Sequence, residues 1–275
     1  MNHSAFPYPG NKVSHVSWIS QYIPEHQRYV EPFCGSASLF FNKIPSKQAI
    51  LNDIDENIVQ FFEVLRDRPD ELIRQIELTP FSVALHERLV ESYYNKEYSE
   101  DRIERAAQFY LLRWSQFGAK IEGTTTFARS GSSVNSRART YKNSTKKLRL
   151  LSNRLKDATI ESKSYDWIIE YYDHPDALFY LDPPYHGTEH RYTSETMDHE
   201  TLITQLKSLD GKFILSYDHQ LEDTDFHSVY KLSKYSMNKE QQDIHREYLY
   251  MNYHPNDVVL HQDKSQTRIT SEAWP

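Results

Sequence analysis

The segment with the clearest chemical character is Leu181-Asp182-Pro183-Pro184-Tyr185, which follows the apolar run 177–180. Such a run predicts a buried strand, and a carboxylate at its end lies at the carboxyl edge of the sheet, where open α/β folds bind their ligands. Pro183 restricts Asp182 to extended geometry, and neither proline has an N–H, so their carbonyls remain as acceptors. The segment therefore offers a carboxylate, a carbonyl and the ring of Tyr185, a combination that suits an amino group on a planar base.

A second motif precedes a predicted helix nearer the N-terminus. In Glu31-Pro32-Phe33-Cys34-Gly35-Ser36-Ala37-Ser38, Gly35 permits a tight turn. The helix that follows presents N–H groups able to bind a carboxylate or phosphate. Asp53 closes the next predicted strand, twenty residues beyond Phe33, and nucleotide-binding folds place the acid that binds ribose hydroxyls at this spacing. With a single glycine, the motif alone is a weak indication of a nucleotide-type ligand.

A third segment, Phe6-Pro7-Tyr8-Pro9-Gly10-Asn11-Lys12, places aromatic rings, a glycine turn and a lysine ahead of the first strand. Taken alone, such a segment is typical of an ordinary N-terminal turn. Its significance comes from its position ahead of the other two motifs.

The elements that must position these motifs alternate between strand and helix. Residues 28–33 predict a strand, Ser36 or Ser38 is expected to cap a helix that ends near Lys43, and residues 48–52 predict the next strand. A strand–helix–strand unit of this length predicts a parallel sheet. Further strands are expected at 159–162, 178–182 and 212–217, with helices up to 172 and around 198–208. The runs 228–232 and 247–253 are expected to pair as an antiparallel hairpin at the sheet edge.

The middle of the chain is predominantly helical. Apolar residues three and four apart, beginning with Ile58 and Phe61, predict helices over about 60 residues from Glu56. Residues 118–141, rich in Ser, Thr, Gly and Arg, predict a loop or hairpin, and Leu148, Leu151 and Leu155 form the apolar stripe of a helix. We therefore expect an α/β core made of residues 1–56 and 157–275, interrupted by a helical, basic insert at 57–156.

Charge is distributed unevenly along the 275 residues. The whole chain carries −7, but residues 123–156 contain nine basic and no acidic side chains, so the remainder carries −16. Segregation of this size indicates a polyanion-binding surface. A solvated basic loop and helix, docked on the protein's own acidic surface, is the alternative.

Composition narrows the class of protein. The apolar runs are short, which excludes a membrane-spanning segment, and the N-terminus lacks the apolar core of a signal peptide. Cys34, the single cysteine, can form neither an internal disulfide nor a cysteine-rich zinc site. These features predict a cytoplasmic protein in a reducing compartment.

Together and in this order, the three motifs resemble those of the DNA N6-adenine methyltransferases of the Dam class (the D12 group). In that family an aromatic-x-Gly-x-Lys motif is followed by Glu-Pro-Phe-x-Gly, an acidic strand end, a helical target-recognition insert and Asp-Pro-Pro-Tyr. The resemblance spans nearly the whole chain, and residues 213–217 and 246–253 are similar to the family's later core strands. It implies a Rossmann-like, S-adenosylmethionine-dependent methyltransferase core.

By position, the resemblance implies a set of S-adenosylmethionine contacts. Tyr8 and Lys12 would contact the cofactor, Phe33 and Gly35 would wall its pocket, and Asp53 would hold its ribose. Tyr165 would stack on the cofactor's adenine, and Asp182 would border the cofactor as well as the target. No metal is expected.

The resemblance also implies the target chemistry. Asp182 and the carbonyl of Pro183 would bind N6 of an adenine flipped out of duplex DNA, because that atom cannot be reached inside the stack, and Tyr185 would stack on the base. Candidate DNA contacts lie in and beside the basic segment, where Arg and Asn can read bases and Lys can hold phosphates: Arg113, Arg129, Asn135, Arg137, Arg139, Lys142 and Lys146.

The sequence departs from the family pattern at three places. The family's frequent second glycine is Ala37 here, and the aspartate that often precedes the stacking aromatic is Ser164. The insert has Thr126-Phe127-Ala128-Arg129-Ser130-Gly131 instead of the Phe-Asn-Val-Pro-Phe-Gly-like hairpin of GATC-methylating enzymes, and only Arg113 and Phe117-Gly118 are similar to the start of that segment. The family's recognition sequence therefore does not transfer.

Other functions remain open from the residues alone. The same fold could methylate cytosine N4, RNA or a protein amide, and Asp53, Asp55 and Asp182 around Mg²⁺ could serve a nuclease or phosphotransferase. His186 and His190 have metal-ligand spacing but no cysteine partner. A non-catalytic DNA-binding module is a third class. The resemblance favours a monomer, and whether a cognate restriction endonuclease or a restriction-modification role exists is open.

Overall fold

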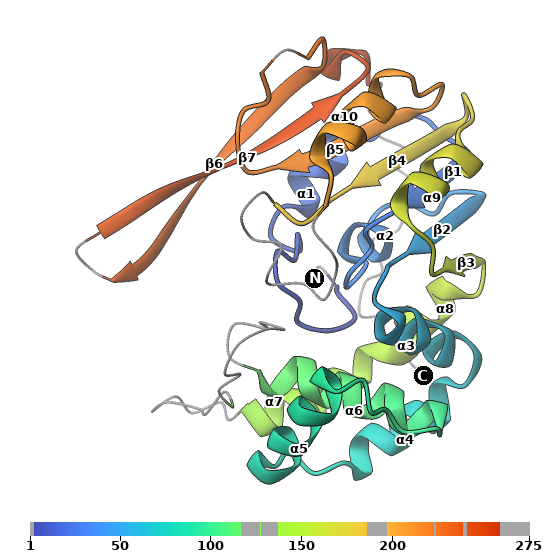
Figure 1. Ribbon diagram of the computed structural model, residues 1–275, viewed down its shortest axis with the longest axis vertical. Helices are drawn as coiled ribbons and strands as arrows, with labels where there is room; N and C mark the ends of the chain where they lie inside the picture. Colours follow the sequence, from blue (N-terminus) through green and yellow to red (C-terminus); the bar gives the residue numbers. More distant parts are fainter. Residues whose placement is uncertain are drawn as a thin grey trace, which may run out of the picture.

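The structure is a computed structural model that describes residues 3–116, 127, 137–185, 197–222, 224–238 and 241–258. For residues 233–238 and 241–245 it describes the backbone only. Figure 1 shows a sheet with its covering helices in the upper part of the molecule and a group of helices below it.

A mixed sheet of seven strands forms the centre of the α/β part, in the order β3-β2-β1-β4-β5-β7-β6. The first five strands of the chain pair in parallel, whereas β7 is antiparallel to β5 and to β6. The strands are β1 (Arg28–Glu31), β2 (Gln48–Asn52), β3 (Ala158–Glu161), β4 (Ala177–Leu181), β5 (Lys212–Tyr217), β6 (His227–Asn238) and β7 (Gln241–Met251).

Helices cover both faces of the sheet, and alternate residues of each strand face opposite layers. Leu178 and Tyr180 of β4 belong to the hydrophobic cluster beneath the N-terminal helices, whereas Phe179 and Leu181 belong to the cluster beneath α9 and α10. This is the period of two expected of a strand buried on both sides. The covering elements are α1 (Val16–Ile19), η1 (Ser20–Tyr22) and α2 (Ser38–Asn42) on one face, and α9 (Tyr165–Tyr172) and α10 (His199–Lys207) on the other; η5 (Pro255–Asp257) follows β7.

Between β2 and β3, where the insert was predicted, the described residues are mostly helical, and these helices pack against the N-terminal loop. Phe61 stacks on Tyr110, and Phe6 from the N-terminal loop contacts Phe61 and Phe109 edge-on, so core and insert share one hydrophobic cluster. The insert consists of α3 (Glu56–Asp67), α4 (Pro69–Leu78), α5 (Val83–Tyr94), α6 (Arg102–Ser115), α7 (Arg137–Ser144), η3 (Thr145–Lys147) and α8 (Leu148–Leu155).

The structure confirms most of the predicted elements. The 48–52 and 212–217 strands occur as predicted, and the late hairpin pairs Ser228 with Tyr250 at the sheet edge, in strands longer than expected. The α/β fold class is therefore correct. Phe127 pairs with Gln116 in an isolated antiparallel bridge, as a hairpin requires.

Two local predictions were wrong. Residues 137–141 were expected in a loop but begin α7, whose residue Tyr141 is buried against Phe81 and Tyr110. Neither Ser36 nor Ser38 caps α2: the residue at the N-cap is Ala37, in a left-handed conformation (φ 52°), and its side chain makes no capping hydrogen bond. Tertiary contacts, absent from the local pattern, explain both differences.

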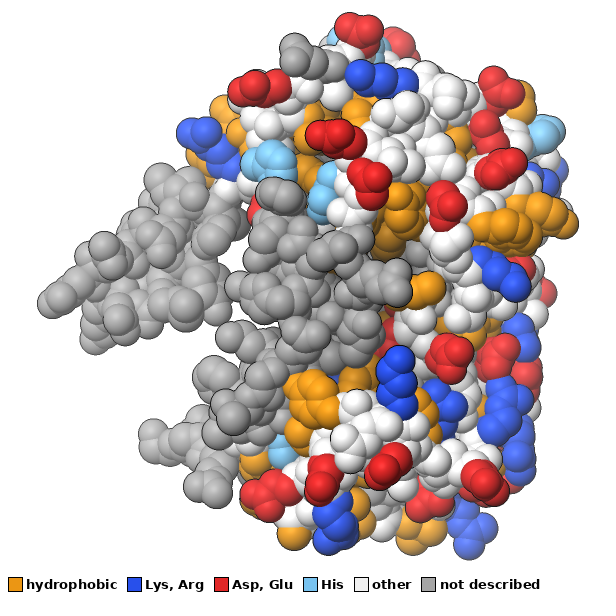
Figure 2. All heavy atoms as spheres, viewed as in Figure 1, with side chains coloured by type: hydrophobic (Ala, Val, Ile, Leu, Met, Phe, Trp, Pro, Cys, Tyr) orange, Lys and Arg blue, Asp and Glu red, His pale blue; other side chains and the backbone are white. Residues whose placement is uncertain are grey.

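Charged side chains are unevenly spread over the face shown in Figure 2. Acidic side chains are scattered over the whole of this face, and several basic side chains lie at the lower right among acidic ones. No helix in the described part of the chain is both long and apolar enough to cross a membrane.

Candidate functional site

A cavity of about 670 Å³ opens at the carboxyl ends of β1 and β4. At this pair the strand order reverses direction, since β2 and β3 lie on one side of β1 while β4 and β5 lie on the other, and open α/β sheets bind ligands at such a point. The seven residues predicted as cofactor contacts all line the cavity: Tyr8, Lys12, Phe33, Gly35, Asp53, Tyr165 and Asp182.

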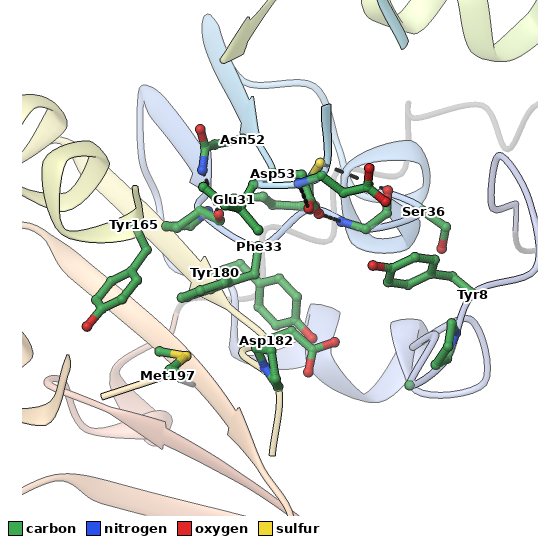
Figure 3. Close-up of a pocket in the computed structure, with 18 of the residues that line it drawn as sticks. Tyr8, Glu31, Phe33, Ser36, Asn52, Asp53, Tyr165, Tyr180, Asp182 and Met197 are labelled. Carbon is green, nitrogen blue, oxygen red and sulfur yellow. Dashed lines mark hydrogen bonds between the residues drawn. The ribbon is translucent and has the colours of Figure 1, made fainter. Parts of the chain in front are cut away.

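Figure 3 shows how the labelled side chains surround this cavity. Tyr165 lies at one end and Tyr8 at the other, with Asp53 and Asp182 on opposite sides between them. Residues from the N-terminal loop, β1, β2, α9 and β4 therefore meet around one space.

Gly35 allows the N-terminal loop to approach the β1–α2 turn. It has a φ of +47°, and a Cβ atom at this position would lie 2.9 Å from ring atoms of Tyr8. The side chain of Asn11 fixes the loop further, donating to Ser36 Oγ (3.1 Å) and accepting from the hydroxyl of Ser38 (2.8 Å). The two serines thus hold the loop that carries Tyr8, which is why they are not available to cap α2.

Asp53 shapes the same turn from the end of β2. Its carboxylate accepts the N–H of Gly35 (2.9 Å) and the N–H of Asp55 (3.0 Å). Burial raises the pKa of Asp53 to about 7, although both hydrogen bonds favour the ionised form. Asp53 therefore has a structural role as well as a place in the cavity wall, and its contact with a ribose stays a prediction.

An aromatic wall closes one end of the cavity. The rings of Phe33 and Tyr165 lie 5.4 Å apart between centroids, tilted by 33°, and the hydroxyl of Tyr165 donates to the backbone carbonyl of Asp198 (3.2 Å). Ser164, which differs from the family's frequent aspartate, also lines the cavity. Such a wall suits a planar ring by stacking.

Asp182 lies in a cluster of charged groups at the end of β4. Lys12 Nζ donates to Asp182 Oδ1 (2.7 Å) and to the carbonyl of Gly10 (3.0 Å), and it lies 3.5 Å from Glu247 Oε1. The hydroxyl of Tyr185 donates to Glu247 Oε1 (2.6 Å) and lies 3.4 Å from Asp182 Oδ1. Burial raises the pKa of Asp182 to about 6; Lys12 lowers that pKa and Glu247 raises it.

Of the three predicted catalytic residues, only Asp182 lines the cavity. Pro183 is buried, and Tyr185 lies beyond Asp182, with its ring 5.9 Å from that of Tyr217 and under the ammonium of Lys12. Asp182 therefore stands between the cavity and the aromatic group of Tyr185.

Three further residues belong to this site but were given no role in the sequence analysis, although Glu31 begins the second motif. Glu31 lines the cavity and accepts hydrogen bonds from the hydroxyl of Tyr29 and the N–H of Phe40, and burial raises its pKa to about 7. Tyr180 also lines the cavity, and its position two residues before Asp182, on the same face of β4, was a usable signal. Glu247 lies in the segment 246–253, which is similar to a later core strand of the family, but its contacts could not be predicted because its partners are distant in sequence.

The predicted DNA contacts fall into two groups. Arg137, Arg139, Lys142 and Lys146 are exposed on α7 and η3. Arg129 and Asn135 lie outside the described residues.

Arg113 differs from the predicted surface contact. Only 1% of it is exposed, and its guanidinium lies over the rings of Tyr93 and Phe109. Its three guanidinium nitrogens have no hydrogen-bond partner among the described residues. In this arrangement the side chain cannot contact DNA, because the aromatic side chains of α5 and α6 cover it.

The described residues contain no group of three or more His, Cys, Asp and Glu side chains arranged to hold a metal. Asp53 and Asp55 lie beside each other after β2, where Asp55 accepts from Asn57 and Tyr93, while Asp182 is bonded to Lys12. His186 and His190 lie outside the described residues.

Comparison with protein families gives one match over most of the chain. Residues 8–250 match the model of the D12 class N6 adenine-specific DNA methyltransferase family.

Three individual relatives of the chain are named as methyltransferases or as a DNA adenine methylase. The chain is 25% identical over 240 residues to the type II methyltransferase M.CviBI of Paramecium bursaria Chlorella virus NC1A, an alignment covering 82% of this chain and 88% of that protein. It is 26% identical over 206 residues to the type II methyltransferase M.MjaIII of Methanocaldococcus jannaschii (65% and 67% covered). The DNA adenine methylase of Escherichia coli K12 is 28% identical over 121 residues (42% of each).

Among solved structures, a putative methyltransferase from Escherichia coli aligns with a TM-score of 0.36 and 10% identity over 89% of each chain. A putative methyltransferase from Streptococcus mutans, in complex with SAH, aligns with a TM-score of 0.35 and 9% identity over 86% of this chain and 96% of that one.

Proposed function

We propose a site assignment for this chain, which belongs to the D12 class of N6 adenine-specific DNA methyltransferases: the cavity at the ends of β1 and β4 binds S-adenosylmethionine, and Asp182 receives the amino group of an adenine flipped out of duplex DNA. The observation that supports it most is the position of Asp182, which borders the cavity on one side and Tyr185 on the other. A group held by this carboxylate would face both the cofactor and an aromatic ring.

The cavity wall has the chemistry that the cofactor requires. S-adenosylmethionine supplies an electrophilic methyl group on a positively charged sulfur. Carboxylates line the space, the Phe33–Tyr165 wall offers stacking for its adenine, and the volume lies within the usual range of about 300–1,000 Å³ for small-ligand sites. The buried ring of Tyr180 borders the same space.

The target amino group requires hydrogen-bond acceptors that increase its reactivity, and Asp182 and Pro183 are able to supply them. Adenine N6 is a weak nucleophile because its lone pair is delocalised into the ring. A carboxylate and a backbone carbonyl can accept its two hydrogens and favour the positive charge that builds on nitrogen as the methyl group arrives. Flipping costs a few kcal/mol, which stacking on Tyr185, at about 1–3 kcal/mol per base, partly offsets.

The exposed basic residues of α7 and η3 are the proposed DNA contacts. Arg137, Arg139, Lys142 and Lys146 lie in the segment that carries +9, and the rest of the chain is acidic. Counterion release from phosphates would then supply much of the affinity for DNA. We also propose that the DNA substrate is duplex and that the enzyme acts as a monomer.

The test is tritium transfer from labelled S-adenosylmethionine into unmethylated genomic DNA, followed by nucleoside analysis. We expect label in N6-methyladenine, and none with Asp182→Ala, which should still bind cofactor and DNA. Asp176→Ala is the matched control. Asp176 is an exposed aspartate just before the amino-terminal end of β4, whereas Asp182 follows the carboxyl-terminal end.

Two outcomes would contradict the assignment. Label in N4-methylcytosine would show that the acceptor is wrong, and near-normal methylation by Asp182→Ala would remove this carboxylate from the reaction. Cofactor binding, measured separately by calorimetry, distinguishes a damaged fold from a lost catalytic group.

A further inference from the structure

Glu247 reaches the carboxyl end of β4 from β7, two strands away in the sheet. It lies on β7, one residue before Tyr248, which pairs with Tyr217 at the carboxyl end of β5, and its carboxylate extends past β5 to the end of β4. Only 13% of its side chain is exposed. A carboxylate held this far from solvent requires partners in place.

Three groups converge on one oxygen of this carboxylate. Oε1 accepts the hydroxyl of Ser216 (2.5 Å) and the hydroxyl of Tyr185 (2.6 Å), and the ammonium of Lys12 lies 3.5 Å away. Glu247 thus contacts the aromatic residue assigned to the target base and the lysine that is bonded to Asp182. It contacts neither the cavity nor the proposed position of the amino group.

The net charge of Lys12, Asp182 and Glu247 determines how Glu247 can influence methyl transfer. Lys12 is 6% exposed and its ammonium is 2.7 Å from Asp182 Oδ1. With Lys12 and Asp182 alone, the cluster would be neutral, whereas Glu247 gives it one net negative charge. Because N6 gains positive charge during methyl transfer, a lysine balanced by a second carboxylate opposes the reaction less than an unbalanced one.

The hydrogen bond to Tyr185 has a second consequence. The ring can stack on a base only if its side chain is held in one orientation, and the bond from its hydroxyl to Glu247 fixes the far end of the ring. Ser216, which lies on β5, in turn fixes the carboxylate of Glu247 by donating a hydrogen bond to it.

We propose that Glu247 is a positioning residue for methyl transfer, balancing the charge of Lys12 and holding the ring of Tyr185 so that Asp182 acts on the target amino group. This inference rests on the proposed assignment of Asp182 and Tyr185. It adds a residue that neither touches the cofactor nor belongs to any of the three sequence motifs.

Glu247→Gln tests the proposal, since the amide keeps the size and can still accept the hydroxyl of Tyr185. We expect kcat to fall about tenfold or more, with the KM for S-adenosylmethionine within about twofold of wild type, because Glu247 does not line the cavity. Glu161→Gln is the matched control: Glu161 accepts the hydroxyl of Tyr172 at 3.0 Å, away from the cavity.

The pH profile supplies a readout that a merely structural role would not move. Glu247 raises the pKa of Asp182, so its neutralisation should shift the acid limb of kcat to lower pH. The other groups acting on Asp182 are Lys12, Tyr185, Tyr180 and Glu31, while His15 and Lys231 are near Glu247. None of these residues is altered in Glu247→Gln.

Tyr185→Phe separates the two parts of the proposal, because it removes the hydrogen bond and keeps the charge. The Tyr185 hydroxyl lowers the pKa of Asp182, so in this variant the acid limb should move to higher pH, opposite to the shift in Glu247→Gln. Equal shifts in both variants would contradict a charge role for Glu247.

A wild-type kcat and acid limb in Glu247→Gln, alongside an inactive Asp182→Ala, would overturn this inference and leave the site assignment intact. Activity in Asp182→Ala would instead remove the assignment itself. Should Glu247→Gln not fold, Glu247→Asp replaces it: the charge remains but is withdrawn by one methylene, so a lowered kcat is expected and an unchanged one overturns the proposal.

Discussion

Asp182 is held between opposing influences. Lys12 favours its ionised form, whereas burial and Glu247 disfavour it, and its pKa is raised to about 6. A raised pKa makes the carboxyl group protonated at a higher pH than an ordinary aspartate. In the proposed assignment, protonation of Asp182 removes one acceptor for the target amino group and the negative charge that favours a positive nitrogen.

The pH dependence of the wild-type enzyme should follow from this pKa. We expect kcat to fall as the pH drops through about 6 and to level off above it. The measurement is kcat at saturating S-adenosylmethionine and DNA, because saturation separates Asp182 from acids such as Asp53, whose proposed role is in cofactor binding. A kcat that is constant between about pH 5 and about pH 8 would show that Asp182 is not needed in its ionised form.

At the scale of elements, the helices between β2 and β3 are joined to the core beside the cavity at the ends of β1 and β4. Asp55, which lines the cavity and caps α3 by accepting the N–H of Asn57 (2.9 Å), also accepts the hydroxyl of Tyr93 from α5 (2.6 Å). Lys96, just after α5, lines the cavity as well. The helices of the insert are therefore anchored to the strand end that shapes the site.

Tyr93→Phe should weaken this anchor. The variant keeps the ring but leaves the buried carboxylate of Asp55 short of one donor, so we expect the free energy of unfolding to fall by about 1–3 kcal/mol. Urea denaturation measures it. Tyr98→Phe is the control, since its ring packs against that of Tyr93. An unchanged stability of Tyr93→Phe would mean that water replaces the lost donor.

For the molecule as a whole, charge segregation predicts how DNA is held. The insert exposes Arg137, Arg139, Lys142 and Lys146 on α7 and η3, and the remainder of the chain outside residues 123–156 carries −16. A polyanion should therefore dock on the insert and be repelled elsewhere.

Charge reversal of Arg137 and Arg139 to Glu should weaken DNA binding and flatten its salt dependence. Each lost phosphate contact lowers the slope of log K against log salt by about 0.9. The measurement is DNA affinity by fluorescence anisotropy at several salt concentrations. Reversal of Lys47 and Lys207 is the matched control, because Lys47 precedes β2 and Lys207 ends α10, both away from the carboxyl edge of the strands. Equal losses in both double variants would indicate a general charge effect instead of a binding surface.

Much of the core was predictable from the sequence because its signals are local. Hydrophobic runs separated by turns predicted β1, β2, β4 and β5 close to their observed bounds. Residues at the ends of parallel strands necessarily meet at one edge of the sheet, so Asp53 and Asp182 could be assigned to one site without knowing the strand order. The three motifs and their order then sufficed to indicate the family.

Interactions between residues distant in sequence could not be predicted in this way. Lys12 and Asp182 are 170 positions apart and Tyr185 and Glu247 are 62 apart. The second pair meets because β4, β5 and β7 are neighbours in the sheet, and the first because hydrogen bonds of Asn11 with Ser36 and Ser38 hold the N-terminal loop against the turn after β1. The burial of Arg113 has the same origin, since its cover comes partly from Tyr93 on another helix.

The sequence by itself determined which chemical groups stand at the strand ends, because hydrophobic periodicity and turn residues act over a few positions. Which groups surround them was determined by folding, because strand order and helix packing bring together side chains that no local pattern relates. The charge balance around Asp182 belongs to this second kind. It depends on a lysine from the N-terminal loop and a glutamate from β7, placed at the same strand end by the tertiary structure.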